Sequence, residues 1–342
     1  MSGTRDDLPG PANPGAVTDH QILVVENLKT YFFVQDGIVC AVDDVSFSLA
    51  PGEVLGLVGE SGSGKSMTCR SIMRIVPPPG RIVEGRILYQ GEDILAWPES
   101  RLPSYRGSEV SMILQEPMTA LNPVLSIGTQ IVETIVQHEG STQHAARGRA
   151  IELLRLVGIP SPERRLDEYP HQFSGGMRQR AMIAIALACK PQVLLADEPT
   201  TALDVTIQDQ IIRLVTDLQH ELGMSVIWVT HDLGVVAQIC HRVAVMYAGR
   251  IVEHADVVEL FENSRHPYTH GLMESIPTSV SRQGSLVPIP GQPPNLLNLA
   301  PGCAFAPRCR YVVDACHSAD TPLRTVTDGH WSACIRFEEI WT

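Results

Sequence analysis

The sequence predicts an α/β fold in which a parallel β-sheet is joined to an antiparallel β subdomain, a helical subdomain and a small cysteine-containing C-terminal extension. Apolar runs of strand length alternate with amphipathic helical stretches, and a glycine-rich run follows the first buried strand. Alternating strands and helices form parallel sheets with crossovers, and their ligands lie beyond the carboxyl ends of the strands. We therefore expect the functional residues where polar motifs follow strands.

The elements can be assigned in chain order from their periodicity. Residues 22–50 alternate apolar and polar positions around Asp36 and Gly37, which predicts an antiparallel hairpin, and strand-like alternation resumes at 81–91. Residues 126–187 change to helical spacing, so we expect a helical subdomain at about 116–190. Buried strands are predicted at 54–58, 193–196, 226–229 and 243–247, and an amphipathic helix at 205–222.

Composition limits the class of protein. The chain has 342 residues and a net charge of -12, which argues against a nucleic-acid partner because such binders present basic surfaces to phosphates. No apolar run approaches the ~20 residues of a membrane-spanning helix. Residues 1–20 are rich in Pro, Gly and Asp and are expected to form a disordered leader rather than a signal peptide. We expect the main domain over 21–285 and the extension over 286–342.

The run GESGSGKS at 59–66 is typical of a phosphate-binding loop. Glycines let successive N–H groups turn inward around an anion at the N-terminus of the next helix, although an ordinary glycine-rich turn is the alternative. Lys65 is then expected on the β- and γ-phosphates and the Ser66 hydroxyl on Mg2+. The predicted nucleotide-binding residues of this segment are Gly59, Ser61, Gly62, Ser63, Gly64, Lys65, Ser66 and Met67.

Two further motifs follow strands or begin helices. Asp197 and Glu198 end the apolar run VLLADE, where Asp197 is a candidate to hold Mg2+ through water and Glu198 to orient the attacking water. A solvated strand end is the alternative. Ser174, Gly175 and Gly176 begin a predicted helix with bare N–H groups that can bind a second phosphate, although Ser-Gly-Gly is also a common loop.

Taken in order, these motifs resemble the ATP-binding subunit of an ABC transporter over residues 22–275, which implies a P-loop NTPase core, ATP and Mg2+. On this resemblance 59–66 is Walker A, 174–177 the signature and 193–198 Walker B. Gln115 is the Q-loop glutamine and a ligand of Mg2+, Asp204 lies in the D-loop, and His231 is the switch histidine. Six motifs in the family's order exclude coincidence, although Phe173, Met177 and Arg178 depart from the usual signature.

Two residue roles keep alternatives. The family stacks adenine on an aromatic side chain that is either Tyr31 or Phe32 here; we favour Phe32, and core packing is the alternative for both. A lone histidine after a strand is usually structural, but the place of His231 after VIWVT favours contact with the γ-phosphate.

A narrower resemblance, carried by HPYTHGL at 266–272 and PGCAFAPRC in the tail, is to the ATPases of dipeptide and oligopeptide importers. It implies a second ATP-binding subunit, which we expect to be a paralogue with a homodimer as the alternative. It also implies two transmembrane permease subunits, an extracytoplasmic peptide-binding protein and a peripheral location at the cytoplasmic face of the membrane. The alternatives are an importer of nickel or another small solute, and a soluble ABC ATPase with a redox-sensing tail.

Four cysteines crowd the extension, at Cys303, Cys309, Cys316 and Cys334. Their spacings of five, six and seventeen residues fit neither a short zinc knuckle nor a ferredoxin run, but four thiols in a segment with little core suggest a metal site. The importer resemblance implies a four-iron, four-sulfur (4Fe-4S) cluster on this quartet. Zinc and unliganded or disulfide-bonded cysteines are the alternatives, and His317 and His330 are nearby substitute ligands.

Overall fold

The structure is a computed structural model that describes residues 21–201, 203–275, 288–297 and 299–341. The predicted leader at 1–20 and the domain boundary near residue 285 lie outside the described residues. No helix in the described ranges is both long enough and apolar enough to cross a bilayer.

A large mixed sheet runs through the molecule in the strand order β11-β12-β10-β9-β3-β8-β7-β6. Strands β9, β3, β8, β7 and β6 pair in parallel, and β10, β12 and β11 continue the sheet antiparallel. The parallel sheet predicted from the sequence is confirmed. The strands span Val54–Val58 (β3), Val110–Ile113 (β6), Val193–Asp197 (β7), Ser225–Thr230 (β8), Arg242–Tyr247 (β9), Arg250–Asp256 (β10), Arg324–Thr327 (β11) and His330–Ser332 (β12).

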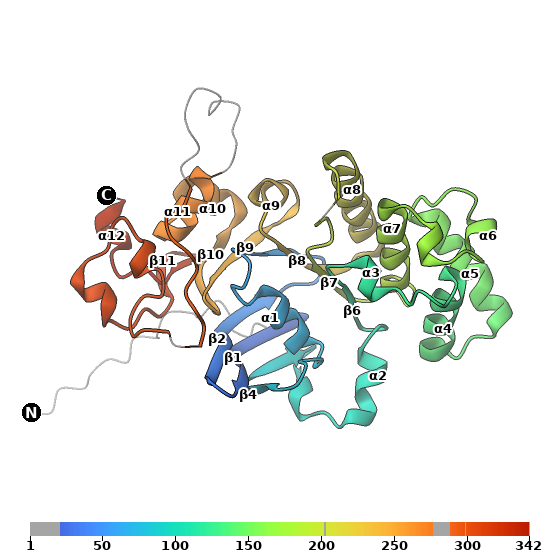
Figure 1. Ribbon diagram of the computed structural model, residues 1–342, viewed down its shortest axis with the longest axis horizontal. Helices are drawn as coiled ribbons and strands as arrows, with labels where there is room; N and C mark the ends of the chain where they lie inside the picture. Colours follow the sequence, from blue (N-terminus) through green and yellow to red (C-terminus); the bar gives the residue numbers. More distant parts are fainter. Residues whose placement is uncertain (1–20, 202, 276–287, 298, 342) are drawn as a thin grey trace, which may run out of the picture.

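A separate antiparallel sheet has the order β2-β1-β4-β5, and its first two strands form the predicted hairpin around Asp36 and Gly37. It lies beside α1 in Figure 1. The strands span Leu23–Val34 (β1), Gly37–Leu49 (β2), Gly80–Tyr89 (β4) and Glu92–Asp93 (β5).

The predicted helical subdomain is a group of helices, α4 to α7, that lies together at one end of the molecule (Figure 1). The predicted helix at 205–222 is α8. The helices span Lys65–Ile72 (α1), Leu102–Tyr105 (α2), Pro117–Ala120 (α3), Ile127–Glu139 (α4), Gln143–Leu156 (α5), Pro162–Arg165 (α6), Gly175–Ala186 (α7), Val205–Leu222 (α8), Leu233–Ile239 (α9), Val257–Asn263 (α10), Pro267–Glu274 (α11) and Phe337–Ile340 (α12).

The large sheet separates two hydrophobic cores. Successive side chains of a strand point to opposite faces, so Val54 and Val58 of β3 pack with the helices α4, α7 and α8, whereas Leu55 and Leu57 pack with the antiparallel sheet and α1. With both faces covered, β3 is a continuous apolar run. The loop after β3 is therefore attached to a rigid strand.

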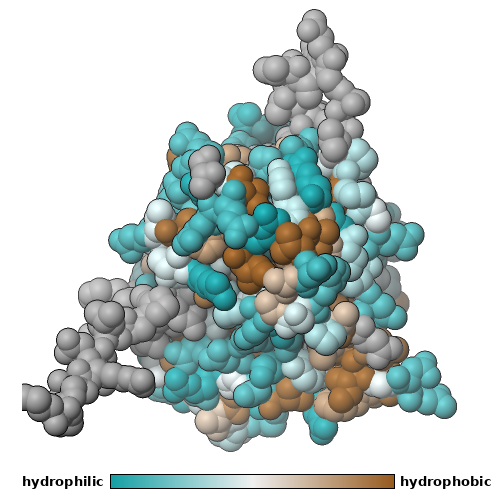
Figure 2. Space-filling view, turned by 90° about the vertical axis from the view of Figure 1, so that its left-hand side faces the viewer, coloured by the Kyte–Doolittle hydropathy of each residue, from teal (hydrophilic) through white to brown (hydrophobic). Residues whose placement is uncertain are grey.

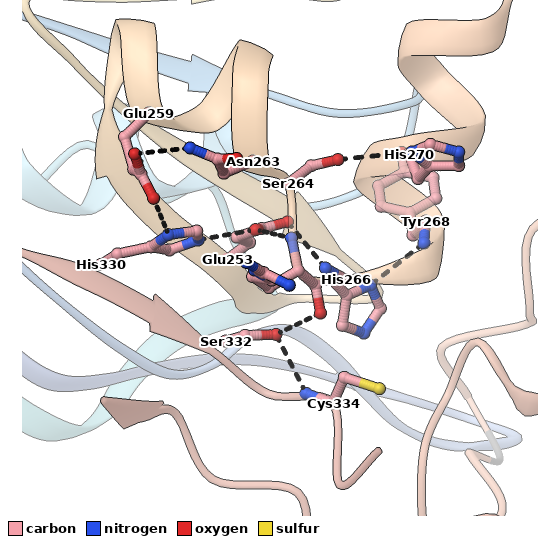
Figure 3. A network of polar contacts seen from close by, with 11 residues as sticks. Glu253, Glu259, Asn263, Ser264, His266, Tyr268, His270, His330, Ser332 and Cys334 are labelled. Atoms are coloured by element: carbon pink, nitrogen blue, oxygen red, sulfur yellow. Dashed lines mark hydrogen bonds and ion pairs between the residues drawn. The ribbon is translucent and has the colours of Figure 1, made fainter. Parts of the chain in front are cut away.

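The C-terminal segment, described over 288–297 and 299–341, joins the molecule through the sheet edge, where β12 pairs with β10 and β11 pairs with β12. His330 on β12 is fully buried, with Nε2 2.8 Å from Glu253 on β10 and Nδ1 3.3 Å from Glu259 on α10 (Figure 3). Figure 2 shows this end of the molecule, where mainly hydrophilic residues surround a group of hydrophobic ones near the middle of the face. The segment is thus packed against the main body.

Candidate functional site

The loop between β3 and α1, residues 59–64, is called the glycine loop, and its backbone requires glycine at two positions. Gly59 has φ +154°, and a Cβ there would lie 2.2 Å from the carbonyl oxygen of Met246; Gly64 has φ +106°, and its Cβ would lie 2.5 Å from that of Ala41. Such contacts and angles exclude side chains. The chain therefore turns tightly from the sheet into the N-terminus of α1, which is the geometry of an anion nest.

Lys65, the first residue of α1, is buried beside this loop. Its Nζ donates hydrogen bonds to the carbonyl oxygens of Gly59 at 2.7 Å and Glu60 at 2.9 Å. Burial lowers the pKa of the ammonium, while the carboxylates of Glu198 and Asp197 oppose that shift. The cation is thus held within the turn, where a phosphate group would pair with it.

The hydroxyl of Ser66 donates to Oδ1 of Asp197, at 2.8 Å, so the start of α1 meets the end of β7. Asp197 is buried, and burial raises the pKa of its carboxyl, although the Ser66 bond lowers it. Both groups offer the oxygen atoms that Mg2+ prefers. Their position fits a magnesium ion bound partly through water.

Three predicted catalytic residues converge next to this pair. Gln115, in the loop after β6, donates from Nε2 to Oε2 of Glu198 at 3.0 Å, and Nδ1 of His231 lies 3.6 Å from Oε1 of Glu198. Thr201 also donates its hydroxyl to Oε2 of Glu198, at 2.8 Å. Residues that follow β6, β7 and β8 therefore surround one carboxylate at the carboxyl edge of the parallel sheet.

The backbone of Glu198 is itself constrained. It has φ +47°, in the left-handed region, and its N–H donates to the carbonyl oxygen of Val229 on β8 at 3.0 Å. Such a conformation in a non-glycine residue is uncommon and is often found at functional sites. The backbone of Glu198, directly after β7, is thus tied to β8.

The signature residues lie elsewhere in the chain. Ser174 caps α7 through a 3.3 Å bond from the Met177 N–H to its Oγ, and no heavy atom lies within 4 Å of a Cβ built at Gly175. Figure 1 shows α7 with the helical group, away from α1. Asp204 caps α8, accepting the N–H of Ile207 at 2.9 Å. Within one chain, α7 and its signature residues thus lie apart from α1 and the glycine loop.

The two candidate aromatic residues point in different directions. The Tyr31 hydroxyl donates to Oδ1 of Asp43 at 2.6 Å. The Phe32 ring packs next to Gly80 and Val76, because its ring carbons are the atoms closest to a Cβ built at Gly80. Met67 is partly buried on the core beneath the antiparallel sheet. The choice of Phe32 as the adenine contact stays a prediction.

The four C-terminal cysteines line one cavity together with Phe305, His266 and Pro267. Backbone N–H groups of Tyr311 and Arg336 donate to the sulfurs of Cys309 and Cys334, each at 3.4 Å. Burial raises the pKa of Cys334 to about 12 and also that of Cys303 and Cys309. Across the described ranges, however, no three or more His, Cys, Asp or Glu side chains are grouped so as to hold a metal ion.

Sequence reasoning missed two residues that contact the glycine loop. Arg308 of the C-terminal segment pairs with Glu60 of the loop, and Tyr268 on α11 accepts the Glu60 N–H. Arg308 and Glu60 are 248 residues apart, and neither periodicity nor motif spacing relates them. Only the folded arrangement shows this contact.

Comparison with protein families gives two matches along the chain. A family model described as ABC transporter matches residues 42–201, which contain the glycine loop, Gln115, the signature and Asp197. A second model, described as oligopeptide/dipeptide transporter C-terminal region, matches residues 252–316, which contain Tyr268, Arg308 and three of the four cysteines.

Curated relatives match almost the whole chain. A putative peptide import ATP-binding protein of Brucella abortus is 52% identical over 331 residues, covering 93% of this chain and 98% of that protein. An oligopeptide transport ATP-binding protein of Bacillus subtilis is 50% identical, covering 91% and 87% of the two chains. An oligopeptide transport ATP-binding protein of Salmonella typhimurium is 44% identical, and the match covers 98% of each chain.

Solved structures show the same fold. The dimeric structure of a bacterial ABC transporter cassette aligns with a TM-score of 0.62 and 27% identity, covering 69% of this chain and 98% of that one. The structure of cbiO1 from Clostridium perfringens, part of the ABC transporter complex cbiONQ, aligns with a TM-score of 0.61 and 29% identity, covering 71% of this chain and 92% of that one.

Proposed function

The chain belongs to the ABC transporter ATP-binding proteins, and from that premise we propose that it hydrolyses ATP to power the import of dipeptides or oligopeptides. Its relatives at 44–52% identity are named as peptide import or oligopeptide transport ATP-binding proteins. The match at 252–316 to an oligopeptide/dipeptide transporter region supports the same substrate class.

The observation that carries the ATPase assignment is the convergence of Lys65, Ser66, Asp197 and Glu198 at one edge of the sheet, with Gln115 and His231 on Glu198. We assign the loop N–H groups and Lys65 to the phosphates of ATP. Ser66, Gln115 and Asp197 would hold Mg2+, which supplies positive charge to the phosphate oxygens. Glu198 orients the attacking water, and His231 positions it with the γ-phosphate.

The signature residues Ser174, Gly175 and Gly176 and the D-loop Asp204 act on the nucleotide of a second ATP-binding subunit. Support comes from the position of α7 away from α1 within one chain, and from the dimeric cassette that shares this fold. We propose that the second subunit is a paralogue, that two permease subunits span the membrane, and that an extracytoplasmic peptide-binding protein delivers substrate. The chain would then lie at the cytoplasmic face of the membrane.

Substitution of Lys65 tests the nucleotide site. Lys65→Ala removes the buried cation, and truncating one partner of such a charge pair costs about 2 kcal/mol or more, or ~30-fold in ATP affinity. Lys29→Ala is the matched control, because its ammonium pairs with Glu84 on the antiparallel sheet. Titration with a fluorescent ATP analogue measures both. Wild-type affinity of Lys65→Ala for the ATP analogue would show that the glycine loop does not bind the phosphates.

Substrate and partners are tested by purification of the tagged chain from its membrane. We expect two permease subunits to copurify and a glutamine variant of Glu198 to abolish uptake of radiolabelled peptides. Uptake of nickel in place of peptides would overturn the substrate assignment and leave the ATPase assignment intact.

We also propose that Cys303, Cys309, Cys316 and Cys334 hold a 4Fe-4S cluster, with zinc as the alternative. The four cysteines line one cavity, and two sulfurs accept backbone N–H groups, which stabilise the thiolates of such clusters. Because the four side chains are not grouped as metal ligands in the described ranges, a cluster would have to draw the sulfurs together. A bound cluster would cross-link a segment that has little apolar core. Anaerobically purified protein should absorb near 400 nm and contain iron and sulfide; zinc would favour the alternative, and absence of both metals would end the proposal.

A further inference from the structure

Every polar group of Glu60, the first residue after Gly59, has a hydrogen-bond partner, and its N–H and carboxylate are held by residues far from it in the sequence. Its N–H donates to the Tyr268 hydroxyl at 2.8 Å, and its carbonyl oxygen accepts from Lys65 at 2.9 Å. Its two carboxylate oxygens accept from the Nη1 and Nη2 atoms of Arg308, at 2.6 and 2.9 Å. The N–H of Glu60 therefore points away from the interior of the glycine loop, and its orientation is fixed from outside.

Arg308 is well placed to hold this carboxylate. Only 5% of its side chain is exposed, and it also donates to the carbonyl oxygen of Pro290 at 2.8 Å and to the Tyr247 hydroxyl at 3.3 Å. Planar, two-bonded arginine–carboxylate pairs are geometrically specific. Because both partners are largely removed from water, loss of either leaves an unpaired charge.

Aromatic rings hold Tyr268 in its place beneath the loop. The ring centroids of Tyr247 and Tyr268 are 4.6 Å apart, and Phe305 lies 5.3 Å from the first and 5.4 Å from the second. All three rings are at most 4% exposed. They come from β9, α11 and the C-terminal segment, so three parts of the chain set the position of the Tyr268 hydroxyl.

We propose that Arg308 and Tyr268 are positioning residues for ATP binding. Through Glu60 they fix the glycine loop in its nucleotide-binding conformation. The inference rests on the proposed role of this loop in holding phosphates. A loop that is already ordered loses less conformational entropy when it binds a ligand. The C-terminal segment thereby contributes to nucleotide affinity without contacting the nucleotide.

The C-terminal segment has a second, independent attachment, which makes the inference testable. Strand β12 pairs with β10, and the buried His330 contacts Glu253 and Glu259 there (Figure 3). Substitution of Arg308 therefore leaves this second attachment in place, while it removes the contacts of the guanidinium with Glu60, Pro290 and Tyr247. The double-mutant cycle with Glu60→Gln then assigns a changed affinity to the contact with the loop.

We expect Arg308→Gln in the full-length chain to weaken binding of a fluorescent ATP analogue by on the order of tenfold, as for loss of one partner of a buried ion pair. Tyr268→Phe, which deletes one oxygen, should weaken it about threefold, the equivalent of one neutral hydrogen bond. In ATPase assays the KM for ATP should rise more than kcat falls. Arg336→Gln is the matched control, because this arginine of the same segment contacts Glu339 and the Tyr311 carbonyl but not the loop.

A double-mutant cycle separates the ion pair from general destabilisation. Glu60→Gln and Arg308→Gln should each weaken binding, and the double variant should be no weaker than the worse single variant. Additive effects would overturn the inference, as would wild-type affinity in Arg308→Gln and Tyr268→Phe. If Lys65→Ala also binds the ATP analogue with wild-type affinity, the assignment of the glycine loop to ATP is itself wrong. If Lys65→Ala loses affinity while Arg308→Gln and Tyr268→Phe keep it, only the positioning role is wrong.

Discussion

Glu198 is the most constrained residue of the proposed catalytic site. Gln115 and Thr201 donate to the same carboxylate oxygen, and His231 lies beside the other. Two donors on one oxygen fix the direction of the other, which suits a group that must orient a water molecule toward a phosphate. The site is therefore arranged around a carboxylate with a set orientation.

Glu198→Gln keeps the shape of this side chain but removes its charge. We expect ATP binding to persist and hydrolysis to fall by about 10²–10⁴-fold, the usual contribution of general-base catalysis. Dimers should accumulate in the presence of ATP, because the nucleotide is bound but not consumed. Phosphate release and size-exclusion chromatography measure both effects.

Glu262→Gln on the exposed side of α10 is the control for loss of one carboxylate. Wild-type turnover in Glu198→Gln would show that another residue orients the water.

Motif order in the sequence predicted Gln115, Glu198 and His231, and the structure brings them together although Gln115 and Glu198 are 83 residues apart. They lie together because each follows a strand of one parallel sheet, whose carboxyl ends meet at one edge, and their catalytic roles stay predictions. No such rule of strand position predicts Thr201, Arg308 or Tyr268. The contacts of Arg308 and Tyr268 with Glu60 depend on how distant segments pack, which one sequence does not specify.

At the scale of elements, the connection from β3 to α1 depends on its glycines. Gly64 combines a positive φ with close backbone neighbours, whereas Gly52 has φ +72° and nothing within 4 Å of a Cβ built on it. Alanine at either position must adopt the left-handed conformation, which costs about 1–2 kcal/mol. Only Gly64→Ala must also displace a backbone oxygen.

Gly64→Ala is therefore expected to lower the free energy of unfolding by more than Gly52→Ala and to lose ATP binding, because the start of α1 must move. Urea unfolding and nucleotide titration of the two variants measure these effects. Equal stability and affinity in both would show that the loop adapts without cost.

The predicted strands and the long helices were confirmed because their apolar periodicity is strong. The C-terminal strands β11 and β12 were not predicted. They are short, at four and three residues, and lie in a proline-rich, weakly periodic segment. Pairing with β10 stabilises β12, and pairing with β12 stabilises β11, so tertiary context determines this part of the sheet.

At the scale of the whole molecule, two buried histidines make stability depend on pH. His254 on β10 and His266 at the start of α11 are 0% and 1% exposed. Burial is the largest cause that lowers the pKa of each to about 3, and Arg242 and His330 lower that of His254 further. Among the residues that the structure describes, neither ring nitrogen of His254 has a hydrogen-bond partner, and Nδ1 of His266 accepts the Tyr268 N–H.

Both histidines stay neutral in the folded state while the unfolded chain binds protons below pH ~6.5. Their contribution to stability is therefore complete above pH ~6.5 and is lost as pH falls toward 3. Between pH 7.5 and 5.5 we expect a loss of about 3 kcal/mol in the free energy of unfolding.

Urea unfolding at the two pH values measures this loss. His254→Leu should remove about half of the difference, and His144→Leu, on an exposed position of α5, should leave it unchanged. An undiminished difference in His254→Leu would assign the pH dependence to other groups.

Strand β12 also covers the hydrogen-bonding edge of β10, and the short β11 ends the sheet beyond it. A chain that stopped before these strands would expose unpaired N–H and C=O groups along β10, and such open edges recruit strands from other molecules. The C-terminal segment therefore protects this sheet edge against aggregation. Until β12 pairs with β10, newly made chains can associate with one another through the open edge.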